Sequence, residues 1–129
     1  MKEIDEREFS DLVCEELEKI GEEVLLNNPS TDSKFPCRVI NTPLKSVEET
    51  DDEGNPIKLR FQCTIQHWNG SQRECMNMSS KTDKQLRKKN IIRTNTSEII
   101  KDTVTKKYRL LATYEVRYNC ISDSFNKIK

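Results

Sequence analysis

The stretch Tyr108–Ile121, YRLLATYEVRYNCI, has the clearest pattern in the chain. On one side of it, tyrosine, leucine, alanine, valine and cysteine occupy every second position. A period of two is typical of a β-strand with one buried face. With fourteen residues, it exceeds the usual strand length of about five or six. The pattern therefore predicts a long strand with partner strands beside it and a helix over its apolar face.

The composition predicts a small domain with a thin core. The chain has 129 residues, of which 33% are hydrophobic and 34% are charged. This length corresponds to one domain, residues 1–129, with a polar tail from about residue 122. No run approaches the apolar length of a membrane span, and the N-terminal sequence lacks the apolar segment of a secretion signal. We therefore expect a cytosolic chain without a membrane partner.

The residues that usually carry chemistry are few and scattered. Five cysteines form no CxxC pair, and His67 is the only histidine. Closely spaced zinc ligands are thus missing, and cysteines in a cytosolic chain are expected to be reduced. The sequence also lacks the glycine-rich phosphate loops and the common hydrolase motifs. We predict no catalytic residue, no metal site and no cofactor.

The first half of the chain predicts a helix followed by a long hairpin. Apolar residues recur every three or four positions over residues 4–26, which is typical of a helix with one buried stripe. Gly21 could end this helix or lie within its last turn. Residues 35–49 and 57–68 alternate as strands, and the segment DDEGNP between them is a turn. Pro36 and Pro43 place the first strand at an edge or next to a bulge. The hairpin should project from the body of the protein.

The second half predicts a helix and two more strands. Ser71 and Glu74 have the spacing of a capping box, which opens a helix that continues to about residue 89. Residues 91–103 are rich in β-branched side chains and precede the closing strand. The expected order is helix, strand, strand, helix, strand, strand. This order predicts an α+β fold: a mostly antiparallel four-stranded sheet with both helices on one face.

The formal net charge is zero, yet the charges are separated along the chain. Residues 1–26 carry ten acidic and three basic side chains, whereas residues 71–129 carry six acidic and fourteen basic ones. Such a polarity favours head-to-tail contact between copies. We expect the exposed helix residues to form a subunit interface, with acids on the first helix and bases on the second: Glu15, Glu16, Glu18, Glu22, Glu23, Lys84, Arg87, Lys88 and Lys89.

The turn of the hairpin is a second candidate contact. It is acidic and contains a Gly-Asn pair suited to positive φ. Three consecutive acids in a turn do not converge as a dedicated cation site does. We expect the tip to contact a partner protein through Asp51, Asp52, Glu53, Gly54 and Asn55.

Two other classes of function fit the sequence less well. The basic run QLRKKN is the best candidate for nucleic-acid contact, but its helix has no exposed aromatic residue on which bases could stack. Tyr108, Tyr114 and Tyr118 alternate with apolar residues, which favours a place in the core under a helix. A small RNA-binding α+β domain and a small enzyme thus remain alternatives, in that order.

The N-terminal helix followed by FPCRVI, the long hairpin, the second helix and the closing YRLLATYEVRYNCISDSF span nearly the whole chain. In this order they resemble the tail terminator proteins of long-tailed bacteriophages. The cysteine content and the two prolines of the first strand depart from the pattern expected of that family.

The resemblance implies a structural role in the neck or tail of a virion, after assembly in the host cytoplasm. A tail terminator forms a ring, as a hexamer, that ends tail growth and joins tail to head. Its partners would be its own copies, the tail tube protein and the head-connector proteins. Contact with nucleic acid would be limited to DNA passing through the ring. Another neck protein, such as a head- or tail-completion factor, is the nearest alternative.

Overall fold

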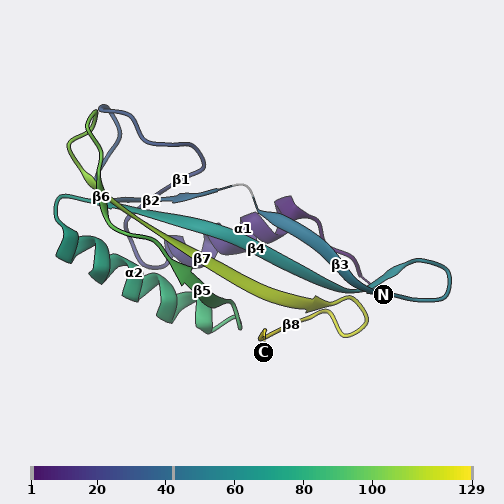
Figure 1. Cartoon of the computed structure of the whole chain (residues 1–129). Coiled ribbons are helices and arrows are strands. Elements are labelled where there is room, and N and C mark those ends of the chain that lie inside the picture. The colour runs from purple at the N-terminus through teal and green to yellow at the C-terminus, as the bar shows by residue number, and fades with distance from the viewer. Residues whose placement is uncertain (1, 42, 129) are drawn as a thin grey trace.

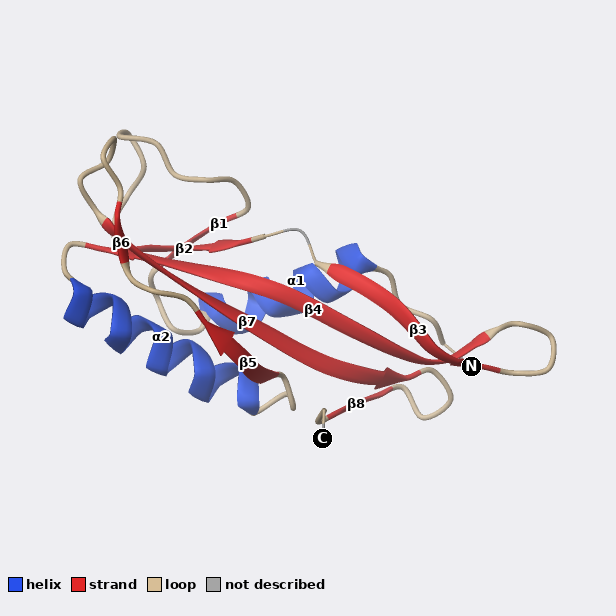
Figure 2. Cartoon of the chain, in the orientation of Figure 1, coloured by secondary structure: helices blue, strands red, loops and turns tan. Residues whose placement is uncertain are grey.

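A computed structural model describes residues 2–41 and 43–128, and Figures 1 and 2 show its trace. The described chain has two helices and eight strands in one sheet. In chain order the elements are α1 (Glu6–Glu18), β1 (Glu23–Leu25), β2 (Cys37–Ile40), β3 (Leu44–Thr50), β4 (Pro56–Asn69), α2 (Gln72–Arg87), β5 (Ile92–Thr96), β6 (Ile100–Lys101), β7 (Tyr108–Asn119) and β8 (Ser124–Asn126).

Strands β4 and β7 form the centre of the sheet. They pair antiparallel over twelve residue pairs, from Lys58 opposite Asn119 to Asn69 opposite Tyr108. The predicted closing strand is confirmed as β7, and every second side chain of it is buried: Leu110, Ala112, Tyr114, Val116 and Tyr118. The prediction that Tyr114 and Tyr118 belong to the core is therefore confirmed as well.

Both helices lie on the face of the sheet to which these side chains point (Figure 1). Helix α1 buries Phe9, Val13 and Leu17 against the sheet. The Phe9 ring stacks on that of Phe61 in β4, with 4.7 Å between the centroids. Helix α2 adds Cys75 and Leu86, among others, to the same core. The core is thus one layer of helices on one face of one sheet.

The α+β class matches the prediction, but the four-stranded sheet is wrong. The strand expected over residues 35–49 is divided into β2 and β3, which pair with successive parts of β4. Pro43 lies between them and cannot donate a ladder hydrogen bond. The strand expected over residues 91–103 is likewise divided into β5 and β6, both paired with β7. Strand β8 was not expected; it pairs with the end of β7.

The first helix is also shorter than predicted. It ends at Glu18 instead of residue 26, and Gly21 then adopts a φ of 114°, which a helix does not tolerate. Residues 23–25 form β1, which runs parallel to β2. Val24 fits the helical spacing of the sequence, but in the structure it packs against the core from the edge of the sheet. Strand β1 makes the sheet mixed and not purely antiparallel.

Side chains at the helix starts explain where the helices begin. Asp5 accepts a hydrogen bond from the Glu8 amide, and the Glu8 carboxylate accepts one from the Asp5 amide, which completes a capping box. Ser71 accepts from the Glu74 amide at the start of α2, which is one of the two bonds of the predicted capping box; the return bond to the Glu74 carboxylate is not made in this part of the described chain. Each cap satisfies a backbone donor that has no partner within its helix.

The second face of the sheet is mostly polar and carries one small apolar cluster. Cys37, Val39 and Trp68 are buried there, with Leu25 and Phe35 packed against them. This cluster lies at the end of the sheet where β7 begins. Two long loops lie at the same end, one between β1 and β2 and one between β6 and β7 (Figure 1). Elsewhere on this face, ion pairs such as Arg60–Glu115, at 2.7 Å, cross the strands.

Replacing Val116 with Asp tests the central place of β7. Val116 is fully buried between sheet and helices, so a carboxylate there has no partner and should cost several kcal/mol, about the whole stability of a small domain. We expect loss of folded protein in thermal and urea melts. Asn119→Asp is the control, because it adds the same residue to the polar face of β7 and keeps the oxygen that accepts from the Ile121 amide. Equal melting curves for both variants would contradict this account.

Candidate assembly surfaces

The predicted hairpin tip is the turn between β3 and β4, and it projects beyond the rest of the sheet (Figure 1). The Asp51 carboxylate organises the turn by accepting hydrogen bonds from the amides of Glu53, at 2.9 Å, and Asn55, at 2.8 Å. These bonds lower the pKa of Asp51. Gly54 takes a φ of 86°, as the sequence suggested for this position. Asp51 is therefore used within the turn, whereas Asp52 and Glu53 are exposed.

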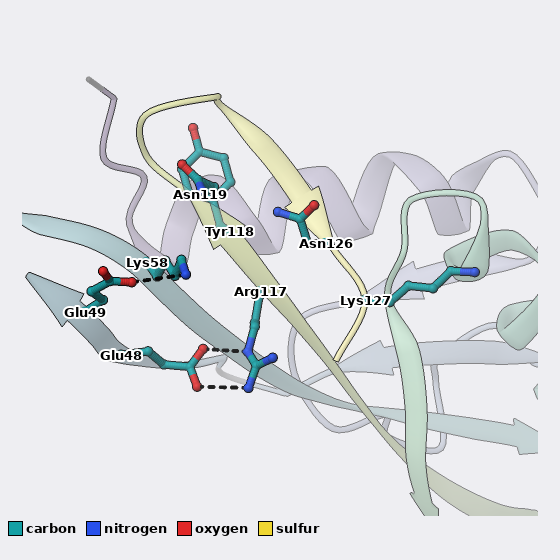
Figure 3. Close-up of a pocket in the computed structure, with 8 residues that line it drawn as sticks. All are labelled: Glu48, Glu49, Lys58, Arg117, Tyr118, Asn119, Asn126 and Lys127. Atoms are coloured by element: carbon teal, nitrogen blue, oxygen red, sulfur yellow. Dashed lines mark hydrogen bonds and ion pairs between the residues drawn. The ribbon is translucent and has the colours of Figure 1, made fainter. Parts of the chain in front are cut away.

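A groove of about 590 Å³ lies at the base of this hairpin, between β3, β4 and the C-terminal segment (Figure 3). Two ion pairs line it: Glu48 with Arg117, at 2.8 Å, and Glu49 with Lys58, at 3.1 Å. The remaining lining residues are Tyr118, Asn119, Asn126 and Lys127. Its acids are thus neutralised by neighbouring bases. The groove offers a polar surface for contact. The Glu48–Arg117 pair ties the hairpin to β7, and the Glu49–Lys58 pair joins the two strands of the hairpin.

The acidic candidates predicted on the first helix do not share one element or one environment, because Glu22 and Glu23 lie beyond the end of α1 and Glu23 begins β1. Glu15, Glu18 and Glu23 are exposed, as predicted. Glu16 is only 4% exposed, so the prediction that it is exposed is wrong. Its carboxylate accepts from Lys19 Nζ, at 2.8 Å, and from Gln85 Nε2 on α2, at 2.9 Å. Burial disfavours the charged form of Glu16, but these two hydrogen bonds and the charges of Lys19 and Lys89 together lower its pKa.

The basic candidates lie near the C-terminal end of α2. Lys84, Arg87, Lys88 and Lys89 are all exposed, and Arg87 pairs with Asp83 at 2.7 Å. Because α1 and α2 pack side by side and are joined through Glu16 and Gln85, the acidic and the basic helix adjoin within one chain. Part of the charge pattern is therefore explained without a second copy.

A buried polar network lies between α2 and the sheet, and the sequence analysis did not anticipate it. Arg38 is fully buried; its Nε donates to Thr82 Oγ1, at 2.7 Å, and its Nη2 to the Met78 carbonyl, at 3.1 Å. Its Nη1 lies 3.5 Å from Glu22 Oε2. Candidate Glu22 is thus engaged within the chain, where it ties the segment before β1 to β2. The available signal was an arginine in the apolar run FPCRVI.

His67 completes this network and is held in one tautomer. Its Nδ1 lies 3.1 Å from the Leu110 carbonyl oxygen, which can only accept, so Nδ1 carries the hydrogen. Its Nε2 then accepts from the Thr82 hydroxyl at 2.8 Å. Burial and the nearby Arg38 charge lower the pKa of His67 to about 3. A neutral histidine with both nitrogens bonded inside the protein has the geometry of a structural residue.

In the described part of the chain, the cysteines and the acidic residues do not form a metal site. All five cysteines are free, and burial raises the pKa of Cys63 to about 12 and that of Cys37 to about 11. The Cys75 thiol donates to backbone carbonyls. Within residues 2–41 and 43–128, no group of three or more histidine, cysteine or acidic residues is arranged to hold a metal ion.

No family model matches the sequence, and no curated protein matches it either. Neither helix in the described part of the chain is long and apolar enough to cross a membrane.

The low pKa of His67 makes the stability of the protein depend on pH. An unfolded histidine titrates near 6.5, whereas folded His67 titrates near 3. The contribution of the neutral ring is complete above pH 6.5 and declines as the pH falls toward 3, by about 1.4 kcal/mol per pH unit. We expect the His67 ring protons, observed by NMR, not to titrate between pH 7 and 5 in the folded protein.

Two measurements serve as controls for that titration. In urea the same resonances should move with a midpoint near 6.5. His67→Gln should flatten the dependence of the free energy of unfolding on pH between 6.5 and 5. A folded-state midpoint close to 6.5 would contradict the buried network.

Proposed function

We propose that this protein is a structural component of a phage neck, where its copies form a ring that ends the tail tube and joins it to the head. The observation that carries the proposal is the projecting β3–β4 hairpin on a sheet whose other end holds two further loops. Such a body presents contacts at both ends while its helices cover one face. The long hairpin and the covering helix are among the features on which the resemblance to tail terminators rests.

The thin core supports the assembly part of the proposal. One helix layer on one sheet face buries little apolar surface, and small cores are commonly completed by association with other chains. A protein that has different surfaces at its two ends can associate head to tail, and such contacts close into rings when the rotation allows it. We propose a homo-oligomeric ring, as a hexamer, with the tail tube and head-connector proteins as its neighbours.

The paired charges support a contact role for the hairpin. Because Glu48 pairs with Arg117 on β7, the hairpin is tied to the body where it leaves it, and the pair of Glu49 with Lys58 joins its two strands. Its turn is ordered by Asp51. A preorganised loop loses less conformational entropy when it binds a partner. We propose that this tip contacts a neighbouring protein of the neck.

The test is the position of the chain in the particle. Tailed particles of the phage that encodes the chain should carry a gold label against it at the head–tail junction, with about six copies per particle by quantitative mass spectrometry. Labelling of the tail tube protein along the whole tail is the control for access. Removal of the chain should leave unjoined heads and tails. Label over the head surface or along the tail, or a chain missing from purified particles, would overturn the proposal.

A further inference from the structure

The ends of the β4–β7 ladder carry two ordered loops of opposite charge. The hairpin tip, residues 51–55, follows β3 at the Asn119 end of β7, and the loop of residues 102–107 precedes Tyr108 at the other end. Twelve residue pairs separate them, which corresponds to about 36 Å at 3.3 Å per residue. The two loops of one chain therefore cannot touch each other.

The acidic end has charges that are not used within the chain. Asp52 and Glu53 are exposed, and among the described residues neither makes an ion pair. The turn that carries them is fixed by Asp51 and by the hydrogen bond from the Asp51 amide to the Asn55 carbonyl, at 2.9 Å. The two carboxylates are thus held outward at the far end of the hairpin.

The opposite end is basic and equally ordered. The Asp102 carboxylate accepts from the Thr105 amide, at 2.8 Å, and from the Thr105 hydroxyl, at 2.9 Å. Val104 is 69% exposed at the apex of this loop. Three lysines lie in or next to this loop, and Lys34 lies in the β1–β2 loop beside Phe35, which Lys107 covers. No ion pair involving them occurs in the described part of the chain: Lys34, Lys101, Lys106 and Lys107.

The aromatic rings at the basic end are covered by cations. Lys101 lies over Tyr108, Lys107 over Phe35 and Arg109 over Trp68, at 5.8, 5.5 and 5.7 Å from the ring centroids. These rings are not free to stack on bases, which is how single-strand binders hold nucleic acid. An exposed valine among the lysines also suits a protein surface better than a phosphate backbone. The basic end therefore favours an acidic protein segment.

We propose that the basic end, residues 101–109 with Lys34, binds the acidic hairpin tip of a second copy of this chain. Asp52 and Glu53 would lie against Lys101 and Lys106, and the contact would repeat from copy to copy. The inference rests on the proposed ring and names the contact that builds it. Exposed ion pairs are individually weak, about 0–1 kcal/mol. In a closed ring the same ion pairs occur at every contact, and Val104 is buried at each of them. Their combined contribution fixes the orientation of neighbouring copies.

Charge exchange between the two ends tests this contact. The tip variant carries Asp52→Lys and Glu53→Lys, and the loop variant carries Lys101→Glu and Lys106→Glu. A control with the same change in charge, Glu6→Lys with Asp11→Lys, alters exposed positions of α1 that lie beside Asn41 and Pro43, away from both ends. Circular dichroism melts confirm that each variant is folded, and sedimentation velocity over a range of concentrations measures assembly.

We expect the wild type and the α1 control to assemble alike. The tip and loop variants alone should each require at least about tenfold higher concentration, because like charges then meet. Mixing the two variants should restore assembly, since each mixed contact again joins opposite charges. The chain with all four substitutions should assemble by itself. Rescue by mixing is a result that a general loss of stability could not produce.

Several results would overturn the contact. They are wild-type-like assembly of either variant alone, no rescue in the mixture, equal impairment of the α1 control, and a wild type that stays monomeric at every concentration. Binding of duplex DNA that is lost in the loop variant, while assembly is unchanged, would make the basic end a nucleic-acid surface. If the chain is labelled at the neck but the charge reversals do not change assembly, only this contact is overturned. If mixing the variants restores assembly but the chain is missing from purified particles, only the proposed function is overturned.

Discussion

The antiparallel ladder between β4 and β7 is the constraint on which the rest of the structure depends. Its register places Leu59, Phe61 and Ile65 beside the apolar side chains of β7, so both strands present one apolar face. A slip of one residue would turn every one of these side chains to solvent. The helices, the flanking strands and the loops at both ends are positioned relative to this pair. The separation of the two charged loops is therefore a property of the ladder.

The helix layer closes the core, and it binds charged side chains whose partners could not be read from the sequence. Glu16 links α1 to α2 through Gln85, and Arg38 links the sheet to α2 and to Glu22. Both charged groups are buried yet hydrogen-bonded, which is the condition under which burial of a charge is tolerated. The helix surfaces are thereby partly committed to the chain's own fold, whereas Asp52, Glu53, Lys34 and Lys106 make no ion pair among the described residues. That contrast directs attention from the helices to the ends of the sheet.

Periodicity predicted the elements that bury one face along their whole length: β4, β7 and the core of both helices. It did not predict the divisions of the outer strands. Pro43, expected at an edge or next to a bulge, instead lies between β2 and β3, and the run over residues 91–103 looks β-like across the gap between β5 and β6. It extended the first helix through Gly21, since Val24 happens to fit the helical spacing. The turn at the hairpin tip could be predicted from Gly54 and Asn55. The burial of Glu16 and Arg38 was not, because it arises from contacts between segments far apart in the chain.

Native-state hydrogen exchange tests most directly whether the β4–β7 ladder holds the structure together. Strands β4 and β7 have partners on both sides, whereas β3, β5, β6 and β8 each pair with one strand only. Amides of β4 and β7 should therefore exchange last, with a free energy equal to that of global unfolding, and amides of the outer strands should exchange earlier through local opening. Amides of β7 that exchange as fast as those of β5 or β8 would contradict the account, because the ladder would then not be the element that holds the structure together.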